Sequence, residues 1–340
     1  MTSLADEIQI VVVYLGRTIP NYVFVNLEDI TRKFPTRSLV FISDNETALK
    51  KARKNGINTW RYIEDLKLKA DWEKETSLPL NFREGFWYAT TSRFFAISAF
   101  SSTRPDQKIL QIEGDVWVSP NFPFQEFAQL PENIDLAYPL ESPQTAAASI
   151  LYLRDYSATL KLSNFAKSEI TENSRVTDMT ILNKIHELKL ANVLVLPTSP
   201  NGANFINQNI DRKLIEEVSR NLGIFNGIFD STTYGLYLAG EDPRNHRGVL
   251  YQYRRQENHI IYCDNAKFKF RENRLFVEDQ DLVEIFNLHI HSKSIKAFTR
   301  MSGSYFKDIT SSTNQIKKKR LYLMTLILIL RALKRRINFE

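Results

Sequence analysis

The amino-acid sequence predicts an α/β fold, a doubly wound mixed sheet flanked by helices. Within the first 115 residues, short apolar runs at 8–15, 38–43 and 109–113 alternate with helical patterns. Such alternation is typical of a sheet with helices on both faces. Polar residues follow each of these runs directly. Ligands bind beyond the carboxyl ends of strands in such sheets, so these polar residues are candidates for a site.

The first strand is expected at Ile8–Leu15, because this continuous apolar run ends at Gly16 and is too short for a helix. The second, at 38–43, is followed by Asp44 and Asn45. Asn45 can cap a helix over about 46–55. The other elements expected in this half are a strand at 59–63, a helical stretch at 81–100 and a strand at 109–113.

After Asp115 the pattern becomes mixed α and β. A helix over 177–188 is indicated by the spacing of its apolar residues, with Thr177 or Asp178 as its cap. Strands are expected at 135–139, 149–153, 192–196 and 285–293, a helix at 229–240, and a hairpin within 259–278 that turns at Glu272-Asn273.

Length and composition set further bounds. A chain of 340 residues with 43% apolar content can bury a large core. The single cysteine, Cys263, excludes an intramolecular disulfide, fits a reducing compartment and lies in an apolar run that predicts burial. The first residues lack the pattern of a secretion signal, so a cytoplasmic location is expected. No G-x-G-x-x-G follows the first strand, which argues against a Rossmann dinucleotide site.

Charge is concentrated near the C-terminus. Residues 317–340 carry a net charge of +7, which leaves about −1 for residues 1–316. Two basic clusters flank the uncharged run Leu321–Leu330, which is too short to span a membrane. A basic and apolar helix that binds an anionic membrane surface through 317–336 is expected, and a helix packed on the body is the alternative. The near-neutral body gives no reason to expect a nucleic-acid partner.

Two clusters carry candidate chemistry. Glu113 and Asp115 follow a predicted strand, flank Gly114 and suit a divalent cation that carries a diphosphate. A solvated acidic turn is the alternative. Later in the chain, His289, His291 and Lys293 alternate on a predicted strand, where an imidazole can bind a metal and an ammonium can bind phosphate. A polar strand face in water is the alternative there.

Taken with these motifs, the chain resembles a bacterial nucleotide-sugar-dependent glycosyltransferase of the GT-A fold, over roughly residues 8–300. Glu113-Gly114-Asp115 stands where that superfamily has Asp-x-Asp, and His289 to Lys293 where it has a late metal-binding His and a phosphate-binding Lys. The block from Phe229 to Arg244 resembles one found in surface-polysaccharide transferases, of the kind that build capsule or lipopolysaccharide.

The resemblance implies roles for further residues. Metal ligands would be Asp115 with His289 or His291, His291 being favoured as the nearer to Lys293, for Mn²⁺ or Mg²⁺. An inverting transfer needs a carboxylate base, for which Asp178 and Asp230 are the candidates, and either could instead cap a helix. The donor, most simply a UDP-sugar, would be contacted by Gly16, Arg17, Asp44, Asn45, Arg93, Glu113 and Lys293. Glu113 departs from the family's Asp, which leaves open whether it binds the metal or the donor's ribose or sugar.

The expected function is transfer of a sugar from a nucleotide-sugar donor to a glycan or lipid-linked acceptor, at the inner face of the plasma membrane. The expected organisation is one domain over residues 1–300, with a nucleotide-binding half at 1–118 and an acceptor- and metal-completing half at 119–300. Residues 301–340 would form the membrane-associating tail. A metal-dependent nucleotidyl- or phosphotransferase and a non-catalytic membrane scaffold are the alternatives.

Overall fold

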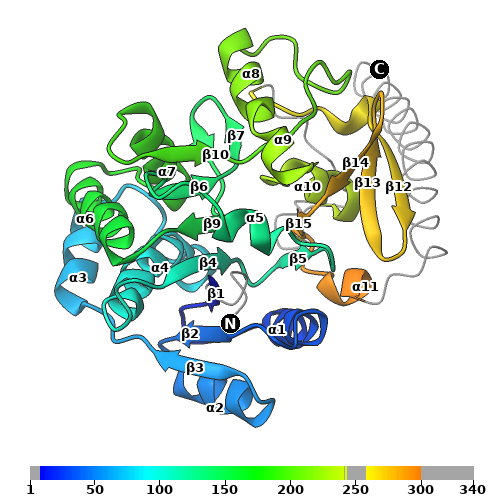
Figure 1. The fold of residues 1–340 in the computed structure, drawn as a ribbon. Coiled ribbons are helices and arrows are strands. Elements are labelled where there is room, and N and C mark those ends of the chain that lie inside the picture. Colours follow the sequence, from blue (N-terminus) through cyan, green and yellow to red (C-terminus); the bar gives the residue numbers. More distant parts are fainter. Residues whose placement is uncertain (1–7, 241, 243–257, 300–340) are drawn as a thin grey trace, which may run out of the picture.

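A seven-stranded mixed sheet forms the centre of the computed structural model (Figure 1). The structure describes residues 8–240, 242 and 258–299. In spatial order the strands of this sheet are β10 (Val193–Val195), β6 (Leu136–Tyr138), β9 (Ile150–Leu153), β4 (Lys108–Ile112), β1 (Ile8–Val13), β2 (Leu39–Ser43) and β3 (Asn58–Arg61). The four strands β4, β1, β2 and β3 run parallel. β9 runs antiparallel to both of its neighbours, so the prediction of a mixed sheet is confirmed.

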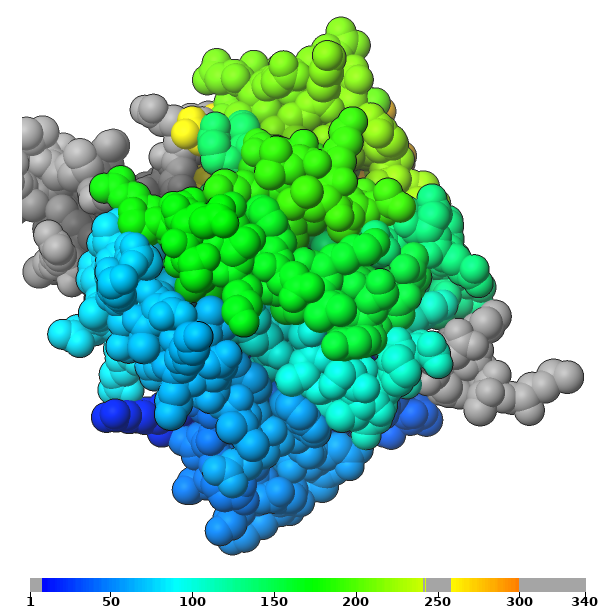
Figure 2. All heavy atoms as spheres, turned by 90° about the vertical axis from the view of Figure 1, so that its left-hand side faces the viewer, coloured from blue at the N-terminus to red at the C-terminus, as the bar shows by residue number. Residues whose placement is uncertain are grey.

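Helices cover both faces of this sheet, because successive strand residues point to opposite sides. In β1, Val11 and Val13 pack into one core, and Ile10 and Val12 pack into the other. The helices on the Val11 side are α3 (Leu66–Glu75), α4 (Phe86–Ser101), α6 (Tyr156–Glu172) and α7 (Asp178–Glu187). Those on the Ile10 side are α1 (Asn21–Lys33), α2 (Glu46–Lys54) and the short α5 (Phe124–Ala128). Figure 2 shows α3 and α6 side by side on one flank of the molecule.

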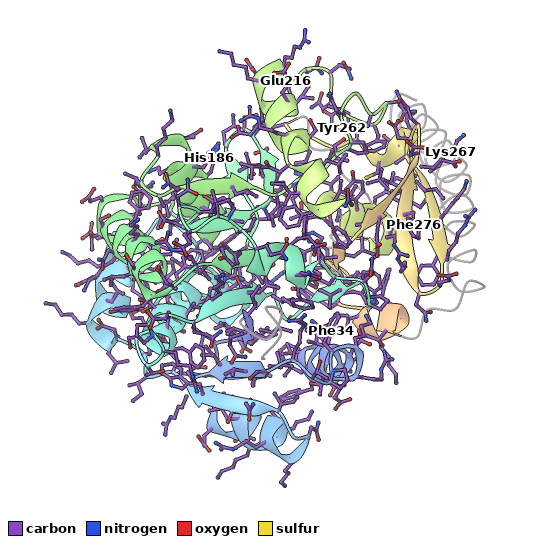
Figure 3. All side chains as sticks on the ribbon, viewed as in Figure 1. Phe34, His186, Glu216, Tyr262, Lys267 and Phe276 are labelled. Carbon is purple, nitrogen blue, oxygen red and sulfur yellow. The ribbon has the colours of Figure 1, made fainter. Side chains whose placement is uncertain are left out.

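A second, smaller sheet stands beside the first, at the right of Figure 1. Its order is β11 (Gly227–Ile228), β14 (Leu282–Ile285), β13 (Arg274–Glu278) and β12 (Lys267–Arg271). Figure 3 labels Lys267 on β12 and Phe276 on β13. Glu272 and Asn273 turn the β12–β13 hairpin with φ of 52° and 61°, at the position predicted from the sequence. The remaining elements are two strand pairs, β5 (Val116–Val118) with β15 (Asn287–His289) and β7 (Leu140–Ser142) with β8 (Thr145–Ala146), the helices α8 (Arg212–Arg220), α9 (Leu222–Phe225), α10 (Thr233–Ala239) and α11 (Ile295–Thr299), and the 3₁₀ turns at Phe82–Glu84 and Cys263–Asn265.

Several expectations are corrected in detail. The predicted strand at 285–293 is divided: β14 ends at Ile285, β15 covers Asn287–His289, and a turn follows. The predicted hairpin occupies only 267–278, and the predicted helix at 229–240 begins at Thr233. Cys263 is buried, as predicted.

The membrane-associating tail predicted at 301–340 lies outside the described residues. Within the ranges that are described, no helix is long and apolar enough to cross a membrane. The division of residues 1–300 at position 118 stays a prediction, although strands from both sides of that position share the central sheet.

The buried carboxylate of Asp230 joins α10 to β15. It accepts backbone N–H groups from Tyr234 (2.9 Å), Gly235 (2.8 Å) and His289 (2.9 Å). A Cβ atom added to Gly235 would lie 2.0 Å from the backbone oxygen of His289, so only glycine permits this approach. The position of His289 therefore depends on helix α10.

We expect Gly235→Ala to destabilise the protein by about 1–3 kcal/mol, because the added methyl group forces α10 away from β15. Urea denaturation followed by circular dichroism measures the change. Gly223→Ala in α9 is the matched control, since a Cβ there meets nothing within 4 Å. Equal stabilities of the two variants would contradict the close packing of α10 on β15.

Candidate active site

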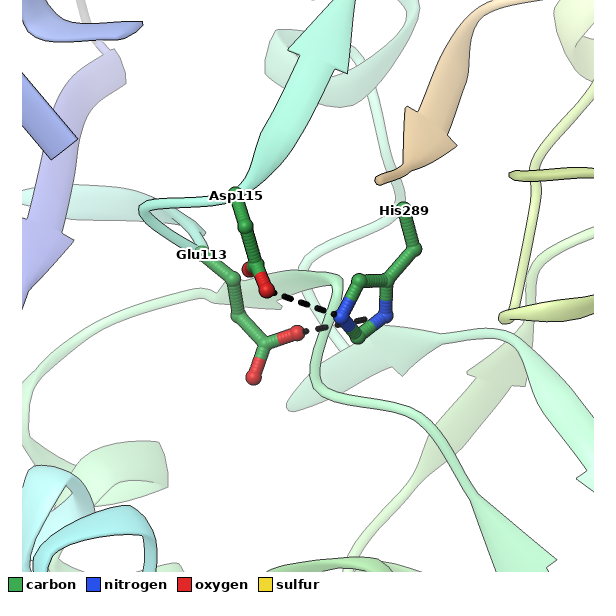
Figure 4. A group of neighbouring side chains, drawn as sticks. All are labelled: Glu113, Asp115 and His289. Carbon is green, nitrogen blue, oxygen red and sulfur yellow. Dashed lines mark ion pairs between the residues drawn. The ribbon is translucent and has the colours of Figure 1, made fainter. Parts of the chain in front are cut away.

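The acidic triplet forms the turn between β4 and β5. The backbone N–H of Val116 donates to the carbonyl oxygen of Glu113 (3.1 Å), so the chain bends here instead of continuing as a strand. Both carboxylates nevertheless point to the same side (Figure 4). Helix α1 supports the turn, because the Asn26 amide donates to the Val116 carbonyl (2.9 Å) and Val23 packs against Gly114.

His289 joins this turn through strand pairing. β15 runs antiparallel to β5 with His289 opposite Val116, and Ile290 N–H donates to the Asp115 carbonyl oxygen (2.9 Å). The imidazole Nε2 lies 3.3 Å from Asp115 Oδ2, and Nδ1 lies 3.6 Å from Glu113 Oε2 (Figure 4). One ligand atom from each of the three residues lies within 4.8 Å of the others.

Burial and charge act in opposite directions on this cluster. Burial disfavours the charged imidazole, but the carboxylates of Asp115 and Glu113 outweigh it and raise the pKa of His289 to about 9. Burial likewise opposes ionisation of Asp115, but Lys293 and His289 hold the pKa of its carboxyl group well below the ordinary value. Asp115 is thus a carboxylate at neutral pH.

His291 stacks on His289 instead of approaching the acids. The ring centroids are 4.3 Å apart and the planes are inclined by 14°. Burial lowers the pKa of His291 well below its ordinary value, and the positive charges of His289 and Lys293 lower it further. The structure therefore brings His289, and not the favoured His291, next to both carboxylates. The metal-binding role of either imidazole stays a prediction.

Two cations complete the cluster. Lys293 Nζ forms an ion pair with Asp115 Oδ2 and lies 5.7 Å from the ring centroid of Tyr22. Arg93, buried in α4, forms ion pairs with Glu113 and with Asp178, and its Nε donates to the Thr90 carbonyl oxygen (2.8 Å). Arg93 thus fixes two acids that are far apart in the sequence.

Asp178 is the first residue of α7, and Thr177 is its cap through a reciprocal capping box with Thr180. Burial raises the pKa of the Asp178 carboxyl group, although Arg93 opposes this shift. Asp230, the other candidate base, is fully buried, and burial raises its pKa to about 6 despite the backbone N–H groups that it accepts. Both carboxylate oxygens of Asp230 accept backbone N–H groups and are therefore occupied by structural hydrogen bonds. The geometry favours Asp178 as the base, and both assignments stay predictions.

The loops after β1 and β2 meet at the same edge of the sheet as the acidic turn, since β1, β2 and β4 are parallel. Gly16 N–H donates to Asp44 Oδ1 (2.9 Å), and the Asn45 amide donates to the Arg17 carbonyl oxygen (2.6 Å). Asn45 also caps α2, as predicted. Hydrogen bonds of these four residues therefore link the loop after β1 to the loop after β2.

Some site residues were not anticipated. The hydroxyl groups of Tyr14 and Tyr22 lie 3.5 Å apart, so this pair connects the loop that follows β1 with Lys293. Asn26 and Asn287 are fully buried amides that hold the turn and β15 by bonds to backbone. These two residues could have been found from the sequence as asparagines within an apolar helical or strand pattern, because a buried amide needs hydrogen-bond partners.

Comparisons with known proteins concern the fold. No protein-family model and no curated protein sequence matches the chain. A glycosyltransferase involved in glycosylation of the major capsid of PBCV-1 is 16% identical, with a TM-score of 0.35 over 55% of this chain and 80% of its own. The galactosyltransferase LgtC, in complex with donor and acceptor sugar analogues, is 15% identical, with a TM-score of 0.39 over 56% of this chain and 73% of its own.

A putative glucose-1-phosphate thymidylyltransferase from Bacillus anthracis is 13% identical, with a TM-score of 0.34 over 56% of this chain and 87% of its own. Identities and TM-scores at this level do not identify a function. The function is therefore argued from the side chains.

We expect Arg93→Met to destabilise the protein by about 3–5 kcal/mol, because it leaves the buried Asp178 and the partly buried Glu113 without this guanidinium. Chemical denaturation at neutral pH measures the loss, and adding Asp178→Asn to the variant should recover part of it. Arg212→Met is the matched control, since the Arg212 side chain is 91% exposed and pairs with Glu216 at the surface. Equal losses at the two positions would contradict a structural role for Arg93.

Proposed function

We propose that this protein is a glycosyltransferase that uses a nucleotide-sugar donor, most simply a UDP-sugar, with a divalent cation. One observation carries the proposal: Glu113, Asp115 and His289 converge at the carboxyl ends of parallel strands, with Lys293 beside them. That edge of an α/β sheet is where ligands bind. A diphosphate needs cations at such a position, and this cluster offers both metal ligands and an ammonium group.

The residues present fit a divalent cation. Carboxylate oxygens and an imidazole nitrogen suit Mn²⁺, and the oxygens suit Mg²⁺. The buried Nδ1 of His289 has no hydrogen-bond partner among the described residues, so it can serve as a ligand atom once the imidazole has lost its proton. Asp115 and His289 would hold the ion, with Glu113 as the third ligand. Once bound, the ion supplies Lewis-acid stabilisation of the departing diphosphate.

The chain's own groups account for the rest of the reaction. Lys293 turns to the diphosphate oxygens as negative charge develops on the leaving group. The loops of Gly16 and Asp44 receive the nucleoside at the same sheet edge. The acceptor hydroxyl oxygen forms the new bond to the anomeric carbon, the bond from that carbon to the diphosphate breaks, and the hydroxyl proton passes to Asp178.

Burial suits Asp178 to this task, because a raised pKa strengthens the carboxylate as a base. Arg93 keeps it ionised and oriented, and the same guanidinium holds Glu113 at the metal site. In this proposal Arg93 is a positioning residue for the two acids, in place of the direct contact with the donor that was expected from the sequence.

The cellular role follows from the resemblance and from the charge of residues 317–340. We place the transfer in surface polysaccharide synthesis, with a glycan or lipid-linked acceptor at the inner face of the plasma membrane. The basic residues would attach the protein to anionic lipid, while the catalytic cluster lies in the domain that precedes them.

We expect Asp115→Asn to weaken UDP binding in the presence of Mn²⁺ by at least roughly tenfold, because it removes a charged ligand oxygen. Isothermal titration calorimetry with full-length protein measures the affinity, and release of UDP from a UDP-sugar measures turnover. Glu73→Gln on the exposed side of α3 is the control and should change neither.

If Asp115→Asn bound UDP with unchanged affinity and unchanged dependence on Mn²⁺, the acidic triplet would be only a turn, and its role in metal binding would be contradicted. Formation of pyrophosphate from a nucleoside triphosphate and a sugar phosphate would identify a nucleotidyltransferase instead. Binding of UDP and Mn²⁺ without any transfer to acceptor or water would favour a non-catalytic scaffold.

We expect the full-length protein to float with anionic liposomes, and removal of residues 317–340 to abolish flotation. Each basic residue near an anionic leaflet contributes about 1 kcal/mol, and the net charge of this segment is +7. Replacing Lys317, Lys318 and Lys319 by Gln should weaken flotation while keeping the apolar run. Flotation that is equal with and without the segment would contradict membrane attachment.

A further inference from the structure

One oxygen of Asp115 lies beside two basic side chains. Oδ2 forms an ion pair with Lys293 Nζ and lies 3.3 Å from His289 Nε2. Asp115 is also one of the three candidate metal ligands. The Lys293 side chain is 21% exposed and the Asp115 side chain 11%, so water screens the pair only in part. A divalent ion at Asp115 would therefore meet an ammonium group already in place.

The backbone is arranged to keep Lys293 there. Lys293 has φ of +61°, in the left-handed region that a residue with a side chain rarely adopts. Its N–H closes a turn on the carbonyl oxygen of Ile290 (2.9 Å), and Ile290 N–H donates to the carbonyl oxygen of Asp115 (2.9 Å). The turn is thus anchored to the residue that its lysine neutralises. Strain of this kind persists only where the surrounding structure fixes it.

Repulsion between like charges determines what happens when a divalent ion binds at Asp115. A divalent ion and an ammonium group that share one carboxylate repel each other strongly at such short range. A lysine side chain, unlike a metal ligand on a strand, can swing on its flexible stem to another anion. The nearest anion of the proposed reaction is the donor's diphosphate. When it binds, Lys293 has a new partner and Asp115 becomes free for the metal.

We propose that Lys293 is the resident cation of Asp115, and that it exchanges with the divalent ion, so that metal and nucleoside diphosphate bind tightly only together. The inference rests on the proposed function, because it needs the cluster to bind both. Lys293 is then a positioning residue that sets the order of binding, beyond its contact with phosphate. The free enzyme holds its acidic cluster neutralised by its own side chain.

Calorimetry on the full-length protein tests the exchange with three titrations: Mn²⁺ alone, UDP alone, and UDP at saturating Mn²⁺. In the wild type, Mn²⁺ should strengthen UDP binding at least tenfold. In Lys293→Met, Mn²⁺ alone should bind at least tenfold more tightly than in the wild type, while UDP at saturating Mn²⁺ binds more weakly. The coupling between the two ligands should fall correspondingly.

Two further variants keep the test decisive. Lys293→Arg retains the charge, so Mn²⁺ alone should bind to this variant no more tightly than to the wild type. This comparison can be made even if the Met variant fails to fold. Lys296→Met, on the exposed side of α11, removes a nearby lysine that contacts none of the cluster and should bind like the wild type.

The outcomes separate the two proposals. A wild type that binds neither UDP nor Mn²⁺ would overturn the proposed function and this inference with it. A wild type that binds both, together with a folded Lys293→Met variant whose affinity for Mn²⁺ alone is unchanged or weaker, would overturn the exchange only. Tighter Mn²⁺ binding by Lys293→Arg would also contradict it.

Discussion

The arrangement of the site depends on the buried carboxylate of Asp230. Its two oxygens accept backbone N–H groups from α10 and from His289, and Gly235 lets these two segments touch. Asn287 closes the same contact by bonding the backbone of Asp230 in both directions. β15 is thereby held against α10, and its pairing with β5 brings the imidazole of His289 to an acidic turn more than 170 residues earlier in the chain. The anchor and the strand pairing together bring the carboxylates and the imidazole into one site.

Around this anchor, the charges of the cluster are balanced within the protein. Three carboxylates, from Glu113, Asp115 and Asp178, face three groups that are or can be cationic: Arg93, Lys293 and His289. Burying such charges is tolerable only because each has a partner. Arg93 is enclosed by its two acids, whereas Lys293 is partly exposed and flexible. The cluster therefore combines a buried ion-pair network around Arg93 with one partly exposed pair, which is the pair that we propose a ligand opens.

The sequence predicted the central sheet well because its strands are apolar runs followed directly by polar turns, as at Ile8–Val13 and Leu39–Ser43. Helix α1 was missed: Pro20 at its cap position makes no side-chain bond and its first turn has no acid. The acidic triplet was recognised from its residue types, but its turn geometry depends on Asn26, which is distant in sequence. The sequence could not predict that His289, and not His291, lies next to both carboxylates, because a short strand and a turn replace the expected long strand. The double role of Arg93 likewise requires that the first residue of α7 lies beside α4, which only the tertiary structure shows.

Pulsed electron paramagnetic resonance of Mn²⁺ bound to the full-length protein with UDP tests the central claim, a metal–diphosphate centre at Glu113, Asp115 and His289, most directly. The account predicts couplings of the bound ion both to phosphorus nuclei of UDP and to an imidazole nitrogen, with the nitrogen coupling lost in His289→Gln and retained in His291→Gln. Absence of protein-bound Mn²⁺ in the presence of UDP would contradict it. So would a nitrogen coupling that persists in His289→Gln.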